Sequence, residues 1–246
     1  MSDRKFAVII PAAGKAERFG GSENKTFAKI DGRPVFLRSV ELFLNRSDVC
    51  QIILAVAPTD MGAMKSQFGA NLGFLGVKLI EGGTRRCDTV AAGLKVVSDE
   101  AEYVAIHDAA RPCAAPERIN AVFGEAQKSG AAILAAPLTG TIKRVAASGV
   151  IEETMSREGL FEAQTPQVFR RDVLLKAYAG LTASKAEATD DAQLVELTGH
   201  PVSVVVSDAT NLKITTKADT ALASAILKSR PAKKFEKLGA FEEAQW

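Results

Sequence analysis

The sequence of 246 residues has few cysteines and histidines. Cys50, Cys87 and Cys113 are widely spaced and form no Cys-x-x-Cys pair, so they indicate neither a disulfide framework nor a zinc site. His107 and His200 have no partner pattern for nucleophilic or metal chemistry, and we expect His107 to be a polar residue of the core. This cysteine usage is typical of a reducing compartment.

The sequence also has no large excess of one charge and no long apolar run. Its 31 Lys and Arg residues nearly balance its 29 Asp and Glu residues, which leaves a formal net charge of +2. Bulk binding of long polyanions needs many cations on one face, so this balance argues against a nucleic-acid-binding protein. No apolar run approaches the roughly 18 residues that span a bilayer, and the start lacks a signal-type cleavage site. We therefore expect a soluble, cytoplasmic protein with no nucleic-acid or membrane partner.

Short apolar runs alternate with segments of helical spacing along the first 137 residues. This alternation predicts right-handed βαβ units, and so an α/β fold with a single Rossmann-like, doubly wound, mostly parallel sheet. Ligands of such sheets bind beyond the carboxyl ends of the strands. The expected strands cover residues 6–10, 51–56, 77–80, 103–106 and 131–136, and the expected helices cover 34–44, 59–67, 85–97 and 116–128.

The alternation is interrupted between residues 139 and 158. Residues 141–145 and 150–154 read as two strands about a Ser-Gly turn. An isolated two-stranded hairpin is marginally stable in water, so we expect it to project as a β-arm and to pack against a second subunit in a homodimer.

The rest of the chain predicts a return to α/β structure. After a short segment at 160–163, strand-like segments are expected at 167–169 and 202–206, and helices near 172–179, 190–198 and 217–228. We expect one α/β domain over residues 1–229, which includes the arm, and a C-terminal extension over 230–246.

The segment after the first expected strand has the composition of a phosphate-binding loop. Small residues at Ala12, Ala13 and Gly14 let backbone N–H groups approach a ligand, and Arg18 and Lys25 supply positive charge. Neither a Walker A motif nor Gly-x-Gly-x-x-Gly is present, which argues against an ATPase and a dinucleotide enzyme. A surface loop rich in glycine and lysine is the alternative interpretation.

Two further segments follow expected strands. Gly82 and Gly83 precede Thr84, a candidate helix N-cap, and offer free amides to a polar edge or an anion; simple capping with solvated arginines fits equally well. Asp108 stands three residues before Arg111, where it could hold Mg²⁺ while the arginine neutralises a phosphate. A structural Asp–Arg pair is the alternative there.

Five segments together resemble the 2-C-methyl-D-erythritol 4-phosphate cytidylyltransferase family. They are the loop from Pro11 with its two cations, the Gly82-Gly83 segment, His107-Asp-Ala-Ala-Arg-Pro112, Thr165-Pro-Gln167 and Asn211-Leu-Lys213-Ile-Thr215, and the similarity runs in order from about residue 6 to 228. The resemblance implies the nucleotide-diphospho-sugar transferase type of fold. It also implies a Mg²⁺-dependent homodimer that makes CDP-methylerythritol and pyrophosphate from CTP and methylerythritol phosphate, for non-mevalonate isoprenoid synthesis.

The resemblance also implies roles for individual residues. Catalytic roles fall to Arg18, Lys25, Asp108 and Lys213, and Asp108 would approach the metal. The remaining assignments are CTP contacts by Ala12, Ala13, Gly14, Gly82, Gly83, Thr84 and Thr89, and polyol phosphate contacts by Arg111, Thr165 and, from the partner's arm, Thr141 and Arg157.

Some positions depart from the family's usual pattern. Asn24 and Thr26 replace the Pro and Gln that usually flank the lysine, Thr84 and Ser156 stand where Asp is common, and Thr210 replaces an Asp before Asn211. These departures bear on affinity and base contacts more than on the reaction.

Three other functions are compatible with parts of the sequence. A ribitol 5-phosphate cytidylyltransferase would join CTP to a similar polyol phosphate. A short-chain reductase would need a Tyr-x-x-x-Lys pair, but His107 and Thr182 occupy the fourth positions after Tyr103 and Tyr178, the only tyrosines. A non-catalytic CTP-binding protein is disfavoured because the cations and Asp108 are retained.

Overall fold

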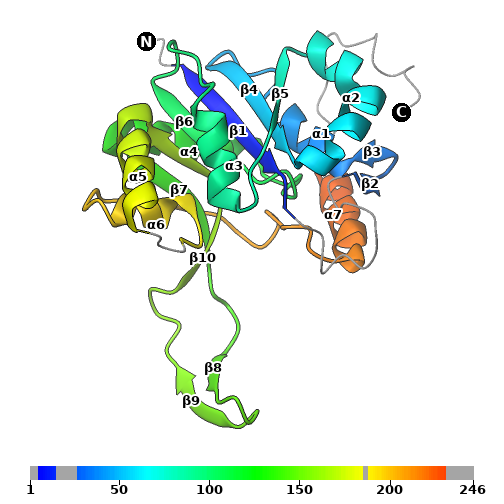
Figure 1. Ribbon diagram of the computed structural model, residues 1–246. Helices are drawn as coiled ribbons and strands as arrows, with labels where there is room; N and C mark the ends of the chain where they lie inside the picture. Colours follow the sequence, from blue (N-terminus) through cyan, green and yellow to red (C-terminus); the bar gives the residue numbers. More distant parts are fainter. Residues whose placement is uncertain (1–4, 15–26, 185–187, 231–246) are drawn as a thin grey trace.

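The computed structural model describes residues 5–14, 27–184 and 188–230, with the side chains of 181–184 left aside. A seven-stranded sheet in the order β11-β7-β10-β6-β1-β4-β5 forms its centre (Figure 1). The strands are β1 (Phe6–Ala12), β4 (Val49–Val56), β5 (Val77–Glu81), β6 (Tyr103–Ile106), β7 (Ala131–Pro137), β10 (Phe161–Arg170) and β11 (Ser203–Val206).

The sheet is mostly parallel, which confirms the predicted fold class. β1 pairs in parallel with β4 and β6, β4 with β5, and β7 with β11. β10 is the exception, since it runs antiparallel to both β6 and β7. The sequence predicted a strand at 167–169, and the structure extends it back to Phe161 in β10, with a register shift against β7 between Ala163 and Gln167.

Helices cover both faces of the sheet, as a doubly wound fold requires. One face packs against α1 (Val35–Glu41), α2 (Pro58–Phe74) and α4 (Pro116–Ser129), and the other against α3 (Arg86–Leu94), α5 (Arg171–Ser184) and α6 (Asp191–Glu196). Side chains of β1 alternate between these layers: Phe6, Val8 and Ile10 face the first, and Ala7 and Ile9 the second. This burial on both faces explains why the strand is apolar throughout.

A small unit beside the sheet was not predicted. β2 (Lys29–Ile30) and β3 (Arg33–Pro34) form a tight hairpin with Asp31 at a φ of 47°. The Asp31 carboxylate accepts hydrogen bonds from Ser224 and Lys228 of α7 (Lys217–Ser229), each at 2.9 Å. Two-residue strands carry too little pattern to be recognised in a sequence.

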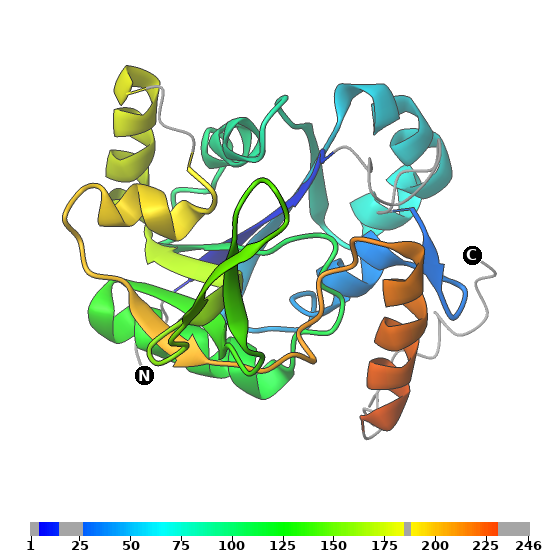
Figure 2. The same cartoon turned by 90° about the horizontal axis from the view of Figure 1, so that it is seen from below.

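The predicted β-arm is confirmed as a hairpin of β8 (Ile142–Val145) and β9 (Ile151–Met155). It extends well away from the body of the molecule, beyond the end of the sheet at which β7 ends and β10 begins (Figure 1). Viewed along the arm, it stands over the middle of the molecule (Figure 2). Val145, Val150 and Ile151 are 51%, 65% and 57% exposed, so the arm carries unburied apolar surface.

The described part of the chain ends at Arg230. Arg230 donates to the carbonyls of Cys113 and Ala114, and residues 231–246 lie outside the described residues. The division into a domain of 1–229 and an extension stays a prediction. Within residues 5–14, 27–184 and 188–230, no helix is long and apolar enough to cross a membrane.

Candidate active site

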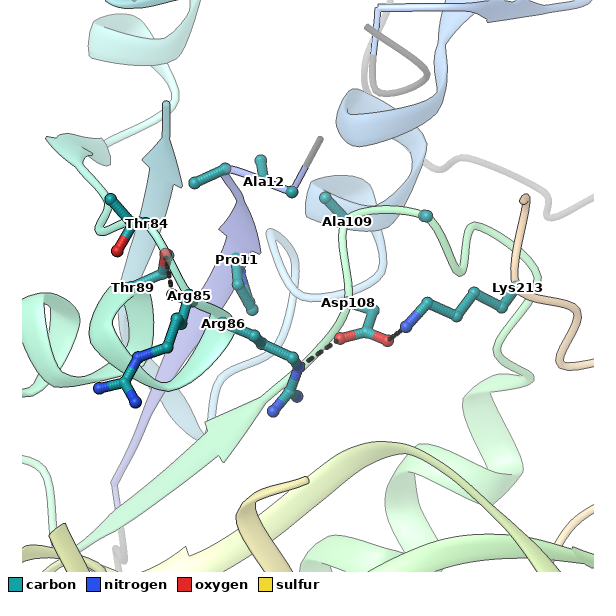
Figure 3. Close-up of a pocket in the computed structure, with 12 residues that line it drawn as sticks. Pro11, Ala12, Thr84, Arg85, Arg86, Thr89, Asp108, Ala109 and Lys213 are labelled. Atoms are coloured by element: carbon teal, nitrogen blue, oxygen red, sulfur yellow. Dashed lines mark hydrogen bonds and ion pairs between the residues drawn. The ribbon is translucent and has the colours of Figure 1, made fainter. Parts of the chain in front are cut away.

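A pocket opens at the carboxyl ends of β1 and β6, where the fold predicts a ligand. Its walls come from the end of β1, the start of α3, the loop after β6 and the loop before α7 (Figure 3). The lining residues are Pro11, Ala12, Ala13, Gly14, Thr84, Arg85, Arg86, Thr89, Asp108, Ala109, Ala110 and Lys213.

Asp108 is the centre of charge in this pocket. Its Oδ2 lies 2.6 Å from Nζ of Lys213, and its Oδ1 lies 3.2 Å from Nε of Arg86 (Figure 3). Nε of Arg111 is 3.8 Å from Oδ2. Burial by itself raises the pKa of a carboxyl, but Arg86, Lys213 and Arg111 outweigh this and hold the pKa of Asp108 well below its usual range. Asp108 is therefore an anion throughout the working range of pH.

The turn between β5 and α3 is built for close backbone packing. A Cβ on Gly82 would meet Ala13 and Thr89 at 2.8 Å, and one on Gly83 would meet Cβ of Asp88 at 2.3 Å. The Thr89 hydroxyl accepts the Gly83 N–H at 3.1 Å and donates to the Arg85 carbonyl at 3.1 Å. These two glycines and Thr89 thus shape the pocket wall, and the Thr89 hydroxyl is engaged within the protein.

Arg85 is the N-cap of α3, so the prediction that Thr84 caps this helix is wrong. Asp88 accepts the Arg85 N–H at 3.2 Å and two bonds from the Arg85 guanidinium at 2.9 and 2.8 Å. These bonds from Arg85 lower the pKa of Asp88 to about 2. The Thr84 hydroxyl also lies 3.3 Å from Asp88, which fixes Thr84 at the pocket edge.

His107 is fully buried behind the pocket, as predicted. Its Nε2 lies 3.0 Å from the Arg111 carbonyl oxygen, which can only accept, so Nε2 carries the hydrogen. Nδ1 must then accept from the Thr165 hydroxyl at 3.2 Å, and that hydroxyl in turn accepts the Asp108 N–H at 3.0 Å. Because the Thr165 hydroxyl donates its proton to His107, its oxygen can only accept a hydrogen bond from a substrate.

The buried imidazole predicts a pH-dependent stability. Burial lowers the pKa of His107 from 6.5 to about 4, so between these values the unfolded chain binds a proton that the folded chain does not. The contribution of His107 to the free energy of unfolding is fully present above pH 6.5. It decreases by about 3 kcal/mol as the pH falls to 4. The free energy of unfolding, measured with urea, should decrease between pH 7 and pH 4 by about 3 kcal/mol more in the wild type than in His107→Gln. Equal losses in the two proteins would contradict this assignment.

Arg111 and Asn211 join the loop after β6 to the loop before α7. Nη1 of Arg111 donates to the Asn211 carbonyl at 2.7 Å, and Nη2 lies 3.5 Å from the Ala163 carbonyl. The Asn211 amide donates to Oε1 of Gln164 at 3.0 Å and to the Thr165 carbonyl at 2.9 Å. These bonds place Lys213, two residues after Asn211, over Asp108.

The structure brings part of the predicted site together. Seven predicted residues line the pocket, while Gly82, Gly83, Arg111 and Thr165 support it from behind. Thr141 and Arg157 are exposed near the arm and are not among the lining residues that the structure describes. Arg18 and Lys25 lie outside the described residues, so their roles stay predictions. The seven are Ala12, Ala13, Gly14, Thr84, Thr89, Asp108 and Lys213.

Sequence reasoning missed Arg85 and Arg86 as site residues. Both line the pocket, and Arg86 contacts Asp108, so the interpretation of Arg86 as a solvated residue is wrong. Their position after two glycines at a predicted helix start was the available signal. A cation in the first turn opposes the helix dipole, which suggests a partner of opposite charge.

Comparisons with known proteins agree with this geometry. The model of the IspD family, described as 2-C-methyl-D-erythritol 4-phosphate cytidylyltransferase, matches residues 6–229. Curated proteins of that name from Rhodopirellula baltica and Frankia casuarinae are 43% and 40% identical, over 90% and 91% of this chain and 94% and 81% of theirs.

Solved structures agree as well. The crystal structure of 2-C-methyl-D-erythritol 4-phosphate cytidylyltransferase from Thermus thermophilus superimposes with a TM-score of 0.77 at 32% identity, covering 91% of this chain and 99% of that one. That of 4-diphosphocytidyl-2C-methyl-D-erythritol synthase from Anaerococcus prevotii gives 0.78 at 27% identity, covering 92% and 97%. The match over nearly the whole described chain shows that this protein belongs to the 2-C-methyl-D-erythritol 4-phosphate cytidylyltransferase family.

Proposed function

We propose that this protein transfers the cytidylyl group of CTP to 2-C-methyl-D-erythritol 4-phosphate, giving CDP-methylerythritol and pyrophosphate, in the non-mevalonate isoprenoid pathway of the cytoplasm. The observation that carries the proposal is the Asp108–Lys213 pair in the pocket at the carboxyl ends of β1 and β6, in a chain that matches the family from residue 6 to 229. The three cysteines are free, which agrees with a reducing compartment.

The reaction needs no general base. A phosphate monoester has a second pKa near 6, so its oxygen is already a nucleophile at neutral pH. The attack is in line on the α-phosphorus of CTP, and pyrophosphate leaves. This agrees with the state of His107 behind the pocket, which is buried and neutral.

The difficulty of the reaction lies in bringing two polyanions together. Fixed cations that face the transferring group stabilise its transition state. Lys213 binds both phosphates in this proposal. Before the substrates bind, its side chain, which is 38% exposed, forms an ion pair with Asp108. Arg18 and Lys25 serve the triphosphate in this proposal.

The pocket fits a magnesium ion that is held mainly by substrate. Asp108 is the one acidic residue among the described residues that line it. The described residues contain no group of three or more acidic, His or Cys side chains that could bind a metal ion together. Mg²⁺ favours one or two carboxylates together with substrate phosphates, so Asp108 is the residue that would hold it. When bound, the ion supplies positive charge to the phosphate oxygens.

The nucleotide occupies the side of the pocket formed by β1 and the start of α3. Ala12, Ala13 and Gly14 offer backbone groups without bulky side chains, and Thr84 lines the neighbouring wall, just before the N-cap of α3. Gly82, Gly83 and Thr89 shape that wall and select the pyrimidine by fit. Arg111 and Thr165 support the polyol phosphate side, next to Asp108 and Lys213.

The protein acts as a homodimer through the arm. The exposed apolar residues of the arm, and its pairing as a two-stranded sheet of its own, support a partner subunit. Arg157 and Thr141 then reach the partner's pocket. In the single chain, Arg157 donates to the Thr139 carbonyl, so its guanidinium is held at the base of the arm.

Arm exchange predicts complementation between inactive subunits. Mixing Arg157→Ala with Lys213→Ala should restore activity, because a hybrid dimer contains one site with both residues intact. Random exchange would yield at most about a quarter of wild-type activity, since half of the dimers are hybrids with one working site. Failure to recover activity, with subunit exchange shown by tagged subunits, would contradict the role of Arg157 across the interface.

Nucleotide selectivity tests the proposed function. Pyrophosphate release with methylerythritol phosphate and Mg²⁺ should be fast with CTP and at least about tenfold slower with ATP or GTP, because the wall shaped by Gly82, Gly83 and Thr89 excludes a purine. Equal rates with CTP and a purine nucleotide would contradict the assignment. Tight CTP binding without turnover would favour a non-catalytic CTP-binding protein.

A further inference from the structure

Arg86 bridges two buried carboxylates that come from distant parts of the chain. Its Nε lies 3.2 Å from Oδ1 of Asp108, and its Nη1 lies 2.6 Å from Oδ2 of Asp191 in α6. The side chain of Asp191 is only 1% exposed. Burying a carboxylate to this degree costs folding free energy unless the charge is fully paired. The Arg86–Asp191 contact therefore matters more to the fold than the exposed ion pairs on the surface.

The second oxygen of Asp191 is held as well. The buried Tyr178 of α5 donates its hydroxyl proton to Oδ1 of Asp191 at 2.5 Å. Burial and the adjacent Asp191 raise the pKa of Tyr178, so this hydroxyl keeps its proton and remains a donor. With one oxygen on Tyr178 and the other on Arg86, the carboxylate of Asp191 has a fixed orientation.

The backbone of Asp191 is tied to the central sheet. Oε1 of Gln167, a residue of β10 that is 1% exposed, accepts the N–H groups of Asp191 and Ala192, both at 3.1 Å. Gln167 also donates to Asp190 at 2.8 Å. Asp191 is therefore a rigid anchor whose position is set by β10.

This anchor determines how Arg86 meets Asp108. A guanidinium tends to pair with a carboxylate through two parallel N–H···O bonds, which would occupy both oxygens of Asp108. Because Nη1 of Arg86 is drawn to Asp191, only Nε reaches Asp108, and only at Oδ1. Oδ2 is left for Lys213, which contacts it at 2.6 Å.

We propose that Asp191 and Tyr178 are positioning residues of the active site, which hold the Arg86 guanidinium on one oxygen of Asp108 and so keep the other oxygen for Lys213. This inference rests on the proposed function, in which Lys213 stabilises the transferring phosphates. If Asp191 is neutralised, Arg86 turns onto both oxygens of Asp108 and displaces Lys213 from its place.

The test compares Asp191→Asn and Tyr178→Phe with the wild type in steady-state pyrophosphate release. Since Lys213 acts on the transition state, we expect kcat to fall about tenfold in Asp191→Asn and about threefold in Tyr178→Phe, with the KM for CTP changed less than about threefold. Tyr103→Phe and Asp48→Asn are matched controls. They remove a buried tyrosine hydroxyl and a carboxylate paired with Arg46 at 2.7 Å, away from the pocket, and should keep kcat within about twofold.

A double-mutant cycle separates positioning from a purely structural role. If Asp191 acts through Lys213, adding Asp191→Asn to Lys213→Met should lower kcat by less than about twofold more. Losses that multiply in the double mutant, or an unchanged kcat in both single variants, would overturn the inference. If Asp191→Asn does not fold, Tyr178→Phe with and without Lys213→Met gives the same decision. A wild type without CTP turnover would instead refute the proposed function.

Discussion

Replacing Lys213 by methionine should lower kcat/KM for pyrophosphate release by about 10³-fold, within the range that a single cation on a transferring phosphoryl group contributes. Lys213 is the cation of the pocket that rests on Asp108 at 2.6 Å while its side chain remains partly exposed, so it can move from this carboxylate to a substrate phosphate. Methionine keeps the apolar part of the side chain and removes the charge. The loss should fall mainly on kcat because the charge that Lys213 meets grows in the transition state.

The neighbouring lysine provides the control for this variant. Lys217 is the first residue of α7, four positions along the same segment, and is not among the described residues that line the pocket. Lys217→Met should therefore retain activity within about twofold. A Lys213→Met enzyme that keeps more than about a tenth of the wild-type kcat/KM would contradict the assigned role.

Replacing Asp108 by asparagine should reduce turnover at least about a hundredfold and also destabilise the fold. The change leaves Arg86, Arg111 and Lys213 without the anion that lies between them. Breaking a buried ion pair by removing one partner typically costs about 3–5 kcal/mol, although the pairing of Arg86 with Asp191 should keep the loss toward the lower end here. Kinetics and urea unfolding of the same preparations measure both effects.

The pH dependence gives a second check on Asp108. Its pKa is depressed in the folded state, so its contribution to stability is complete above the ordinary pKa of an aspartate and is lost only as the pH falls through the lowered value. The stability difference between the wild type and Asp108→Asn should thus be constant from pH 8 to pH 5. A difference that disappears between pH 7 and pH 5 would show that Asp108 is not held as an anion by its three cations.

The strands were predictable because the sheet is covered on both sides. Burial of both faces makes β1 and β6 continuous apolar runs, and such runs are visible in the sequence. β10 was harder to predict because its first residues are exposed near the arm and only its second half enters the core. The arm itself was predictable from the local Ser-Gly turn, where Gly149 has a φ of 83°.

The pocket was predictable in outline for a similar reason, since residues after buried parallel strands meet at one edge. The hydrogen-bond and ion-pair partners of each pocket residue could not be predicted. Arg86 contacts Asp191 across 105 positions of the chain, and no local pattern indicates such a pair. Thr165 was expected at the substrate, but its hydroxyl is used between His107 and the Asp108 N–H, an arrangement set by the packing of β10 against β6.

The product formed from CTP tests the central claim most directly. The purified protein should be incubated with CTP, Mg²⁺ and equal concentrations of methylerythritol, ribitol and hexose phosphates, and the products identified by ³¹P NMR and mass spectrometry. We predict that the diphosphate diester of cytidine and methylerythritol forms together with one equivalent of pyrophosphate, and that it is the dominant product. A strong preference for ribitol phosphate, or no diester from any acceptor, would contradict the account.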